Sequence, residues 1–219
     1  MIKIQNLQFK PKSVLNAFIE NTFVVWDERS HEAAVVDPGM SDEVEELEIK
    51  SFIEENTLDI KYMINTHCHI DHVLGCRFVK ENFNPVYYIP EKDLPLYNNA
   101  GKQAEMFGIE MSKLPKIDKY LTEGEKLLLG NESFCNLYTP GHSPGEFCLN
   151  FDESKFCITG DVLFRESIGR TDLYGGDYNT LIDSIKTKLL TLHDDIVIYP
   201  GHGDESTIGY EKLHNPFLV

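Results

Sequence analysis

The stretch Asn65–Gly75, NTHCHIDHVLG, concentrates residue types that bind metal ions: three histidines and one aspartate fall within six positions. Because side chains at positions i and i+2 of an extended segment point the same way, His67 and His69 could bind one ion together. Asp71 and His72 are expected to begin the following helix, so they leave at another angle and could serve a second ion. A lone HxH pair more often consists of two surface or core histidines that bind no metal. Further candidate ligands elsewhere in the sequence are therefore needed to support a metal site.

Three further candidate ligands occur later in the chain: His142 in TPGHSPG, Asp161 in ITGD and His202 in IYPGHGDES. Each follows a predicted strand and lies in a glycine-containing turn. Strand ends in layered α/β folds can meet at one edge, where binding sites are commonly built. Imidazoles and carboxylates without thiolate suit zinc, iron or manganese. Seven ligands are too many for one tetrahedral ion, so they predict two ions, roughly 3.5–4 Å apart, that activate a hydroxide.

The sequence predicts that alternating strands and helices position these residues. β-Branched and aromatic runs predict strands, and a helical apolar period predicts helices. The predicted strands are 21–27, 32–39, 60–66, 85–90, 126–130, 134–142, 147–151, 155–161 and 195–203. Helices are predicted after an Asp42–Glu45 capping box, over 71–83, in part of 91–109, and over Thr180–Leu192. Two β-rich halves that both carry helices predict an α/β fold with two sheets face to face and helices outside.

Length and composition are typical of a folded domain, and we expect residues 1–219 to form a single one. No apolar run approaches the roughly 18 residues that span a bilayer, and the N-terminus lacks a secretory signal. We therefore expect a cytoplasmic protein without a membrane partner. The net charge of −16 argues against a nucleic acid partner, because phosphate contacts require basic patches. The five cysteines form no CxxC pair, so neither a disulfide framework nor a thiolate zinc site is expected.

Taken in order, THCHIDH, PGH, GD and a final PGH resemble the motif series of the metallo-β-lactamase superfamily, over nearly the whole chain. The resemblance implies an αββα four-layer sandwich, with two mixed sheets and helices outside. It also implies two divalent metal ions, with zinc favoured and iron or manganese as alternatives. The implied ligands are His67, His69 and His142 for the first ion, Asp71, His72 and His202 for the second, and Asp161 as the bridge.

The stretch Phe164–Asp177, FRESIGRTDLYGGD, and the ending NPFLV are similar to the hydroxyacylglutathione hydrolase (glyoxalase II) group, in a short form without a C-terminal helical domain. This similarity implies hydrolysis of an acyl thioester, such as S-lactoylglutathione, by a metal-bridging hydroxide. Asp71 and Asp161 would be the catalytic carboxylates. The partner would be this small-molecule thioester, and the protein a monomer or a small homo-oligomer.

Two residues of the same stretch are candidates for substrate contact. Arg170 suits bidentate binding of a substrate carboxylate, although it could equally hold its own loop through Asp172. Tyr174 could line the pocket or pack the loop. Both remain open at the level of the sequence.

Three other functions are compatible with these motifs. Persulfide dioxygenases of the same superfamily also show a THCH-x-DH motif and a GRTD stretch, and they use one iron, which His67, His142 and Asp161 would bind here. A lactonase is a second alternative. A catalytically silent metal-binding domain is the third, but a structural site has no need of open coordination positions.

Overall fold

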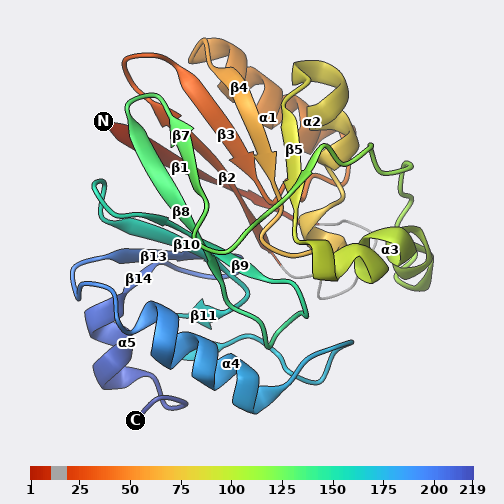
Figure 1. The fold of residues 1–219 in the computed structure, drawn as a ribbon. Coiled ribbons are helices and arrows are strands. Elements are labelled where there is room, and N and C mark those ends of the chain that lie inside the picture. Colours follow the sequence, from red (N-terminus) through yellow and green to blue (C-terminus); the bar gives the residue numbers. More distant parts are fainter. Residues whose placement is uncertain (11–18) are drawn as a thin grey trace.

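The strands of the computed structural model, which describes residues 1–10 and 19–219, form two six-stranded sheets and one small two-stranded sheet. The first sheet has the order β1-β2-β3-β4-β5-β6 and the second β14-β13-β10-β9-β8-β7 (Figure 1). The first sheet contains β1 Ile2–Phe9, β2 Glu20–Asp27, β3 Glu32–Val36, β4 Asp59–Ile64, β5 Val86–Ile89 and β6 Lys119–Tyr120. The second contains β7 Lys126–Leu129, β8 Glu132–Tyr138, β9 Phe147–Phe151, β10 Phe156–Gly160, β13 Val197–Pro200 and β14 Ser206–Thr207, and β11 Leu163–Phe164 pairs with β12 Ser167–Ile168.

Both sheets are mixed, because each combines antiparallel pairs with parallel ones. In the first sheet β1, β2 and β3 are antiparallel neighbours, whereas β3, β4 and β5 run parallel. In the second sheet β10 is antiparallel to β9 and parallel to β13. Parallel neighbours place their carboxyl ends at the same edge of a sheet, which is where the loops that follow β4, β10 and β13 begin.

Strands β2 to β5 of the first sheet bury apolar side chains on both faces, because each face is covered by a different layer. Met63 of β4 packs in one cluster with residues of α1 Glu43–Glu55, α2 Cys76–Phe83 and α3 Leu94–Met106. Its neighbour Ile64 belongs to a second cluster, which also holds Phe134, Leu149 and Ile158 of the opposite sheet. Successive side chains of a strand point to opposite faces, so one apolar run supports both layers.

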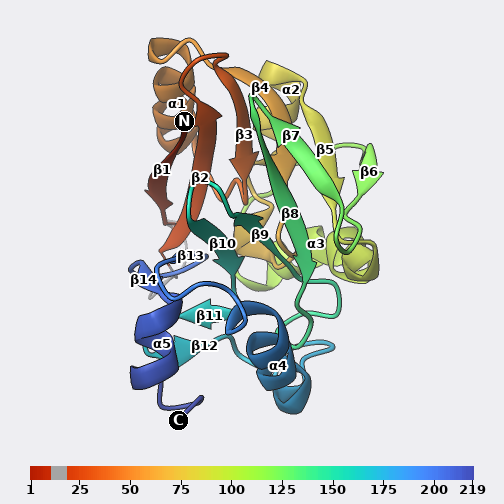
Figure 2. The same ribbon diagram turned by 60° about the vertical axis from the view of Figure 1, so that its left-hand side comes forward.

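A third cluster covers the outer face of the second sheet. Cys148, Cys157 and Ile198 of the sheet pack there against Leu181 of α4 Tyr178–Ser184 and Ile208 of α5 Ile208–His214. Helices therefore cover the outside of both sheets, with α1 and α2 at one end of the molecule and α4 and α5 at the other (Figure 2). The predicted αββα sandwich is confirmed.

Two predicted helices differ from the structure in their bounds. The helix expected from Asp71 is a single 3-10 turn, Ile70–His72, and α2 begins only at Cys76. Gly75 lies between the two, where a Cβ would be only 2.5 Å from the Met40 side chain, and its N–H donates to the Pro38 carbonyl at 2.8 Å. The helix expected over Thr180–Leu192 begins at Tyr178 and turns into a π-helical segment, Ile185–Leu189.

The capping box predicted at the start of α1 is confirmed only in part. Asp42 caps α1 as expected, accepting from the backbone of Val44 and Glu45, but the Glu45 carboxylate accepts from Ser41 N at 2.7 Å rather than from the cap residue. Strand β1 was not predicted. All five cysteines are free, and no helix within the described residues is both long and apolar enough to cross a membrane.

Candidate metal centre

The seven predicted ligands, although spread from position 67 to position 202, come together at the strand ends described above. The ligand atoms of His67, His69 and His142 all lie within 4.8 Å of one another. A second group is formed in the same way by Asp71, His72 and His202. The 3-10 turn gives Asp71 and His72 the change of direction that separates the two groups.

Asp161 lies between the two groups. Its Oδ2 is 3.5 Å from His142 Nε2 in the first group and 3.6 Å from His202 Nε2 in the second, and its Oδ1 is 3.6 Å from His72 Nε2. Atoms that bind one tetrahedral ion at about 2.1 Å lie about 3.4 Å apart. The spacing is therefore that of ligands arranged around shared ions.

Buried ligand atoms without partners show that these residues fit metal ions. Within the described part of the chain, His67 Nε2, His72 Nε2 and Asp161 Oδ1 are buried and make no hydrogen bond. Buried polar atoms are costly unless they are satisfied. Divalent cations bound between the two groups would satisfy these atoms, and the mixture of imidazole and carboxylate suits zinc or iron.

Charge at the site supports the same conclusion. Burial, together with the nearby imidazoles, lowers the pKa of His67 well below its ordinary value and that of His69 to about 4, so both are neutral, as metal ligands must be. Although burial opposes it, His72 and His202 lower the pKa of Asp71. The neighbouring carboxylates Asp71 and Asp161 outweigh burial and raise the pKa of His72, so positive charge is favoured at this position.

Backbone carbonyls behind the site fix the direction of two of the imidazoles. His142 Nδ1 donates to the Arg170 carbonyl at 2.8 Å, and His202 Nδ1 donates to the Ile19 carbonyl at 2.8 Å. Since a carbonyl oxygen only accepts, these bonds leave Nε2 of both rings as the unprotonated atom that faces the site. Hydrogen bonds of this kind commonly hold metal-binding histidines.

One buried carboxylate, Asp37, supports both groups at once. Its Oδ2 lies 3.2 Å from His72 Nδ1 and accepts from the Thr66 hydroxyl at 2.6 Å. That hydroxyl lies 3.1 Å from His67 Nδ1, and Thr66 N donates to Asp37 Oδ1 at 2.7 Å. On the other side, Glu146 Oε1 accepts from Asp161 N at 2.7 Å. Motif spacing did not identify Asp37 or Glu146, although DPG directly after a strand was a signal for the first.

Replacing Asp37 with asparagine is expected to weaken binding of zinc by about tenfold to a hundredfold, because groups behind metal ligands have effects of this size. The measurement is a competition titration of the metal-free protein against a chromophoric chelator. Asp59→Asn, an exposed carboxylate at the start of β4, is the matched control. Wild-type affinity in a folded Asp37→Asn variant would contradict the role of Asp37.

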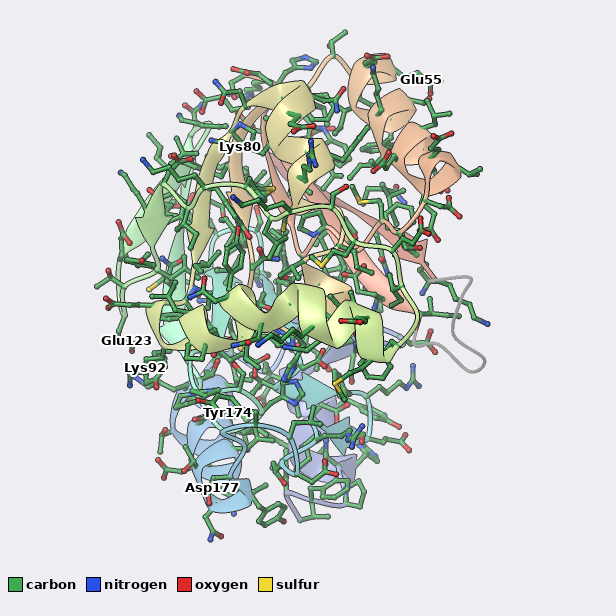
Figure 3. The ribbon with its side chains drawn as sticks, turned by 90° about the vertical axis from the view of Figure 1, so that its right-hand side faces the viewer. Glu55, Lys80, Lys92, Glu123, Tyr174 and Asp177 are labelled. Carbon is green, nitrogen blue, oxygen red and sulfur yellow. The ribbon has the colours of Figure 1, made fainter. Side chains whose placement is uncertain are left out.

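A cavity of about 690 Å³ opens in front of the two groups. Arg170 and Tyr174 both line it. The Arg170 guanidinium is bound by Asp172 in two hydrogen bonds, Nε to Oδ1 at 3.0 Å and Nη2 to Oδ2 at 2.9 Å. Tyr174 lies between α3 and the start of α4, marked by Asp177 (Figure 3).

Comparison with known proteins adds independent findings. Residues 15–202 match the family model of the metallo-beta-lactamase superfamily. Hydroxyacylglutathione hydrolase GloC of Haemophilus influenzae is 44% identical, over 93% of this chain and 95% of that protein. The crystal structure of BLEG-1 B3 metallo-beta-lactamase superposes with a TM-score of 0.85 at 31% identity, covering 100% of both chains. TTHA1623 in a di-iron-bound form superposes with a TM-score of 0.81 at 35% identity, covering 94% of this chain and 98% of that one.

Proposed function

We propose that this chain, which belongs to the metallo-beta-lactamase superfamily, hydrolyses an acyl thioester of the S-lactoylglutathione type with two divalent ions. Its similarity to known metallohydrolases and its clustered histidine and aspartate side chains identify it as a metallohydrolase. The observation that carries the proposal is the position of Asp161, within 3.6 Å of imidazole nitrogens from both ligand groups. The similarity to a hydroxyacylglutathione hydrolase supports the choice of substrate.

The two ligand groups would each hold one ion, and Asp161 would contact both. When bound, the ions supply an ionised water and polarise the thioester carbonyl. Zinc is the metal that we propose; iron fits the same donor atoms, and a related structure is described as di-iron-bound. Asp71 and Asp161 face the cavity, so they are the carboxylates placed to orient the attacking water.

The reaction adds water across the carbon–sulfur bond. A carbon–oxygen bond forms, the carbon–sulfur bond breaks, and the products are a carboxylate, a thiol and one released proton. Asp71 remains ionised at neutral pH because His72 and His202 lower its pKa, so it can accept a hydrogen bond from the water. A thiol with a pKa of about 8.5 leaves without a strong general acid. The site therefore needs no additional proton donor for the leaving group.

Arg170 and Tyr174 are the proposed contacts for the thiol part of the substrate. Both line the cavity on the loop opposite α3, and the Arg170 side chain is 59% exposed at the rim. A substrate carboxylate would reach this guanidinium by replacing Asp172. Solvent screening keeps the existing exposed ion pair weak, so the exchange costs little.

The proposal predicts that the purified protein hydrolyses S-lactoylglutathione and loses this activity on complete removal of metal. Re-addition of zinc, iron or manganese should restore it, since the residues that remain in the metal-free site cannot ionise water at neutral pH. Release of free thiol is the measurement, with circular dichroism to show that the metal-free protein is still folded. Hydrolysis that survives demetallation would contradict the proposal.

A further inference from the structure

The cavity in front of the metal centre has two unlike walls. One wall is α3 and the residue that follows it, and the other is the segment 164–174 (Figure 3). The α3 wall presents Pro95, Leu96, Asn99, Gln103, Met106 and Phe107. The opposite wall contributes Phe164, Arg170, Leu173 and Tyr174.

Charge is distributed unequally between these walls. Among the described residues that line the cavity, and apart from the candidate metal ligands, Arg170 is the only charged one. The α3 wall offers no cation to a carboxylate or a phosphate. Since an unpaired charge is costly to remove from water, a charged part of the substrate is disfavoured along α3. The wall that carries Arg170 can bind a negatively charged part of the substrate.

The α3 wall also exposes apolar surface that the fold itself does not use. Met106 is 84% exposed and Phe107 is 47% exposed, although both border the cavity. Apolar patches left open beside a polar centre commonly mark binding surfaces. A volume of about 690 Å³ is in the range of pockets for molecules much larger than a lactoyl group.

Resting on the proposed thioester hydrolysis, we infer that the α3 wall binds an uncharged, apolar acyl group, while the charged thiol arm extends along the Arg170 side. Glutathione carries charges at both of its ends, so its favourable position is at the solvent-exposed rim. The acyl group is then the part of the substrate that removes Met106 and Phe107 from water. The enzyme selects longer apolar acyl chains over lactoyl.

The test is a series of S-acylglutathiones with acetyl, butyryl and hexanoyl groups. The kcat/KM is expected to rise roughly fourfold for each added methylene, the factor that corresponds to burial of one such group. A second series, of S-methyl-, S-butyl- and S-hexylglutathione, is titrated calorimetrically. These thioethers are not hydrolysed, so their dissociation constants measure how strongly the cavity binds the alkyl chain in the absence of turnover.

Variants separate the two walls. Gln103→Glu keeps the size of the side chain and places a carboxylate on the α3 wall; it should weaken S-hexylglutathione binding about fivefold or more and leave S-methylglutathione within about twofold. Asn98→Asp makes the same amide-to-acid change on an exposed part of α3 that does not line the cavity, and it should change neither ligand. Arg170→Ala should weaken all three thioethers by a similar factor.

The outcomes distinguish this inference from the proposal on which it rests. If lactoylglutathione is hydrolysed but neither kcat/KM nor thioether affinity rises with chain length, the inference is overturned and the hydrolase proposal stands. If no thioester is hydrolysed, the hydrolase proposal fails, and the acyl assignment fails with it, whatever the thioethers bind. Equal effects of Gln103→Glu and Asn98→Asp would also overturn the assignment to the α3 wall.

Discussion

Replacing Asp161 with asparagine should lower kcat/KM for an acyl thioester by about a thousandfold or more, or roughly 4 kcal/mol of transition-state stabilisation. Among the described residues, Asp161 is the carboxylate that lies within 3.6 Å of ring nitrogens of both ligand groups. The amide keeps the shape of the side chain but loses the negative charge that would hold two cations close together. Steady-state kinetics and metal content on the same sample are the measurements.

The control for this substitution is Asp183→Asn, the same change on the exposed side of α4. It should leave both kinetics and metal content unchanged. An Asp161→Asn protein that keeps two ions and wild-type turnover would show that the carboxylate does not hold the ions in the arrangement that hydrolysis needs.

Replacing His202 with alanine distinguishes the hydrolase from a mononuclear iron dioxygenase. His202 Nε2 lies 3.3 Å from Asp71 Oδ2, in the group that a one-iron enzyme would not use. The two-ion hydrolase therefore predicts a loss of about a hundredfold or more in thioester turnover, because the second ion loses a ligand. His142→Ala, in the first group, should be comparably damaging in either kind of enzyme.

His193→Ala serves as the matched control, because this exposed histidine lies outside both groups. Oxygen uptake with glutathione persulfide is measured beside thioester hydrolysis. If His202→Ala retains full activity in the persulfide assay while the wild type hydrolyses no thioester, the dioxygenase alternative is correct.

The candidate metal ligands could be grouped from sequence because each lies in a short motif near the end of an apolar run. His67 and His69 are two positions apart after β4, Asp161 directly follows β10, and His202 lies two residues after β13, so topology brings them to one edge. The same runs predicted the central strands of both sheets, since strands buried on two faces are continuously apolar, whereas the edge strands β1, β6 and β14 were not predicted. The helix expected from Asp71 was wrong, because this residue lies in a single 3-10 turn and α2 begins only at Cys76.

What supports the ligands could not be predicted in the same way. Asp37 reaches His72 across a gap of 35 positions, and Glu146 reaches Asp161 from just before the neighbouring strand β9. Such contacts depend on which strands are neighbours in each sheet, β3 and β4 in the first and β9 and β10 in the second, and no local pattern encodes this pairing. The pairing of Arg170 with Asp172 was predicted from sequence as one of two alternatives. The α3 wall could not be predicted, because it depends on where that helix lies relative to the site.

The most direct test of the two-ion centre is metal analysis by mass spectrometry, on protein expressed without metal supplementation and again after saturation with zinc. The arrangement of two ligand groups around Asp161 predicts two divalent ions per chain at saturation, falling to one or fewer in the Asp161→Asn variant. A folded wild-type protein that binds no more than one ion at saturation would contradict it.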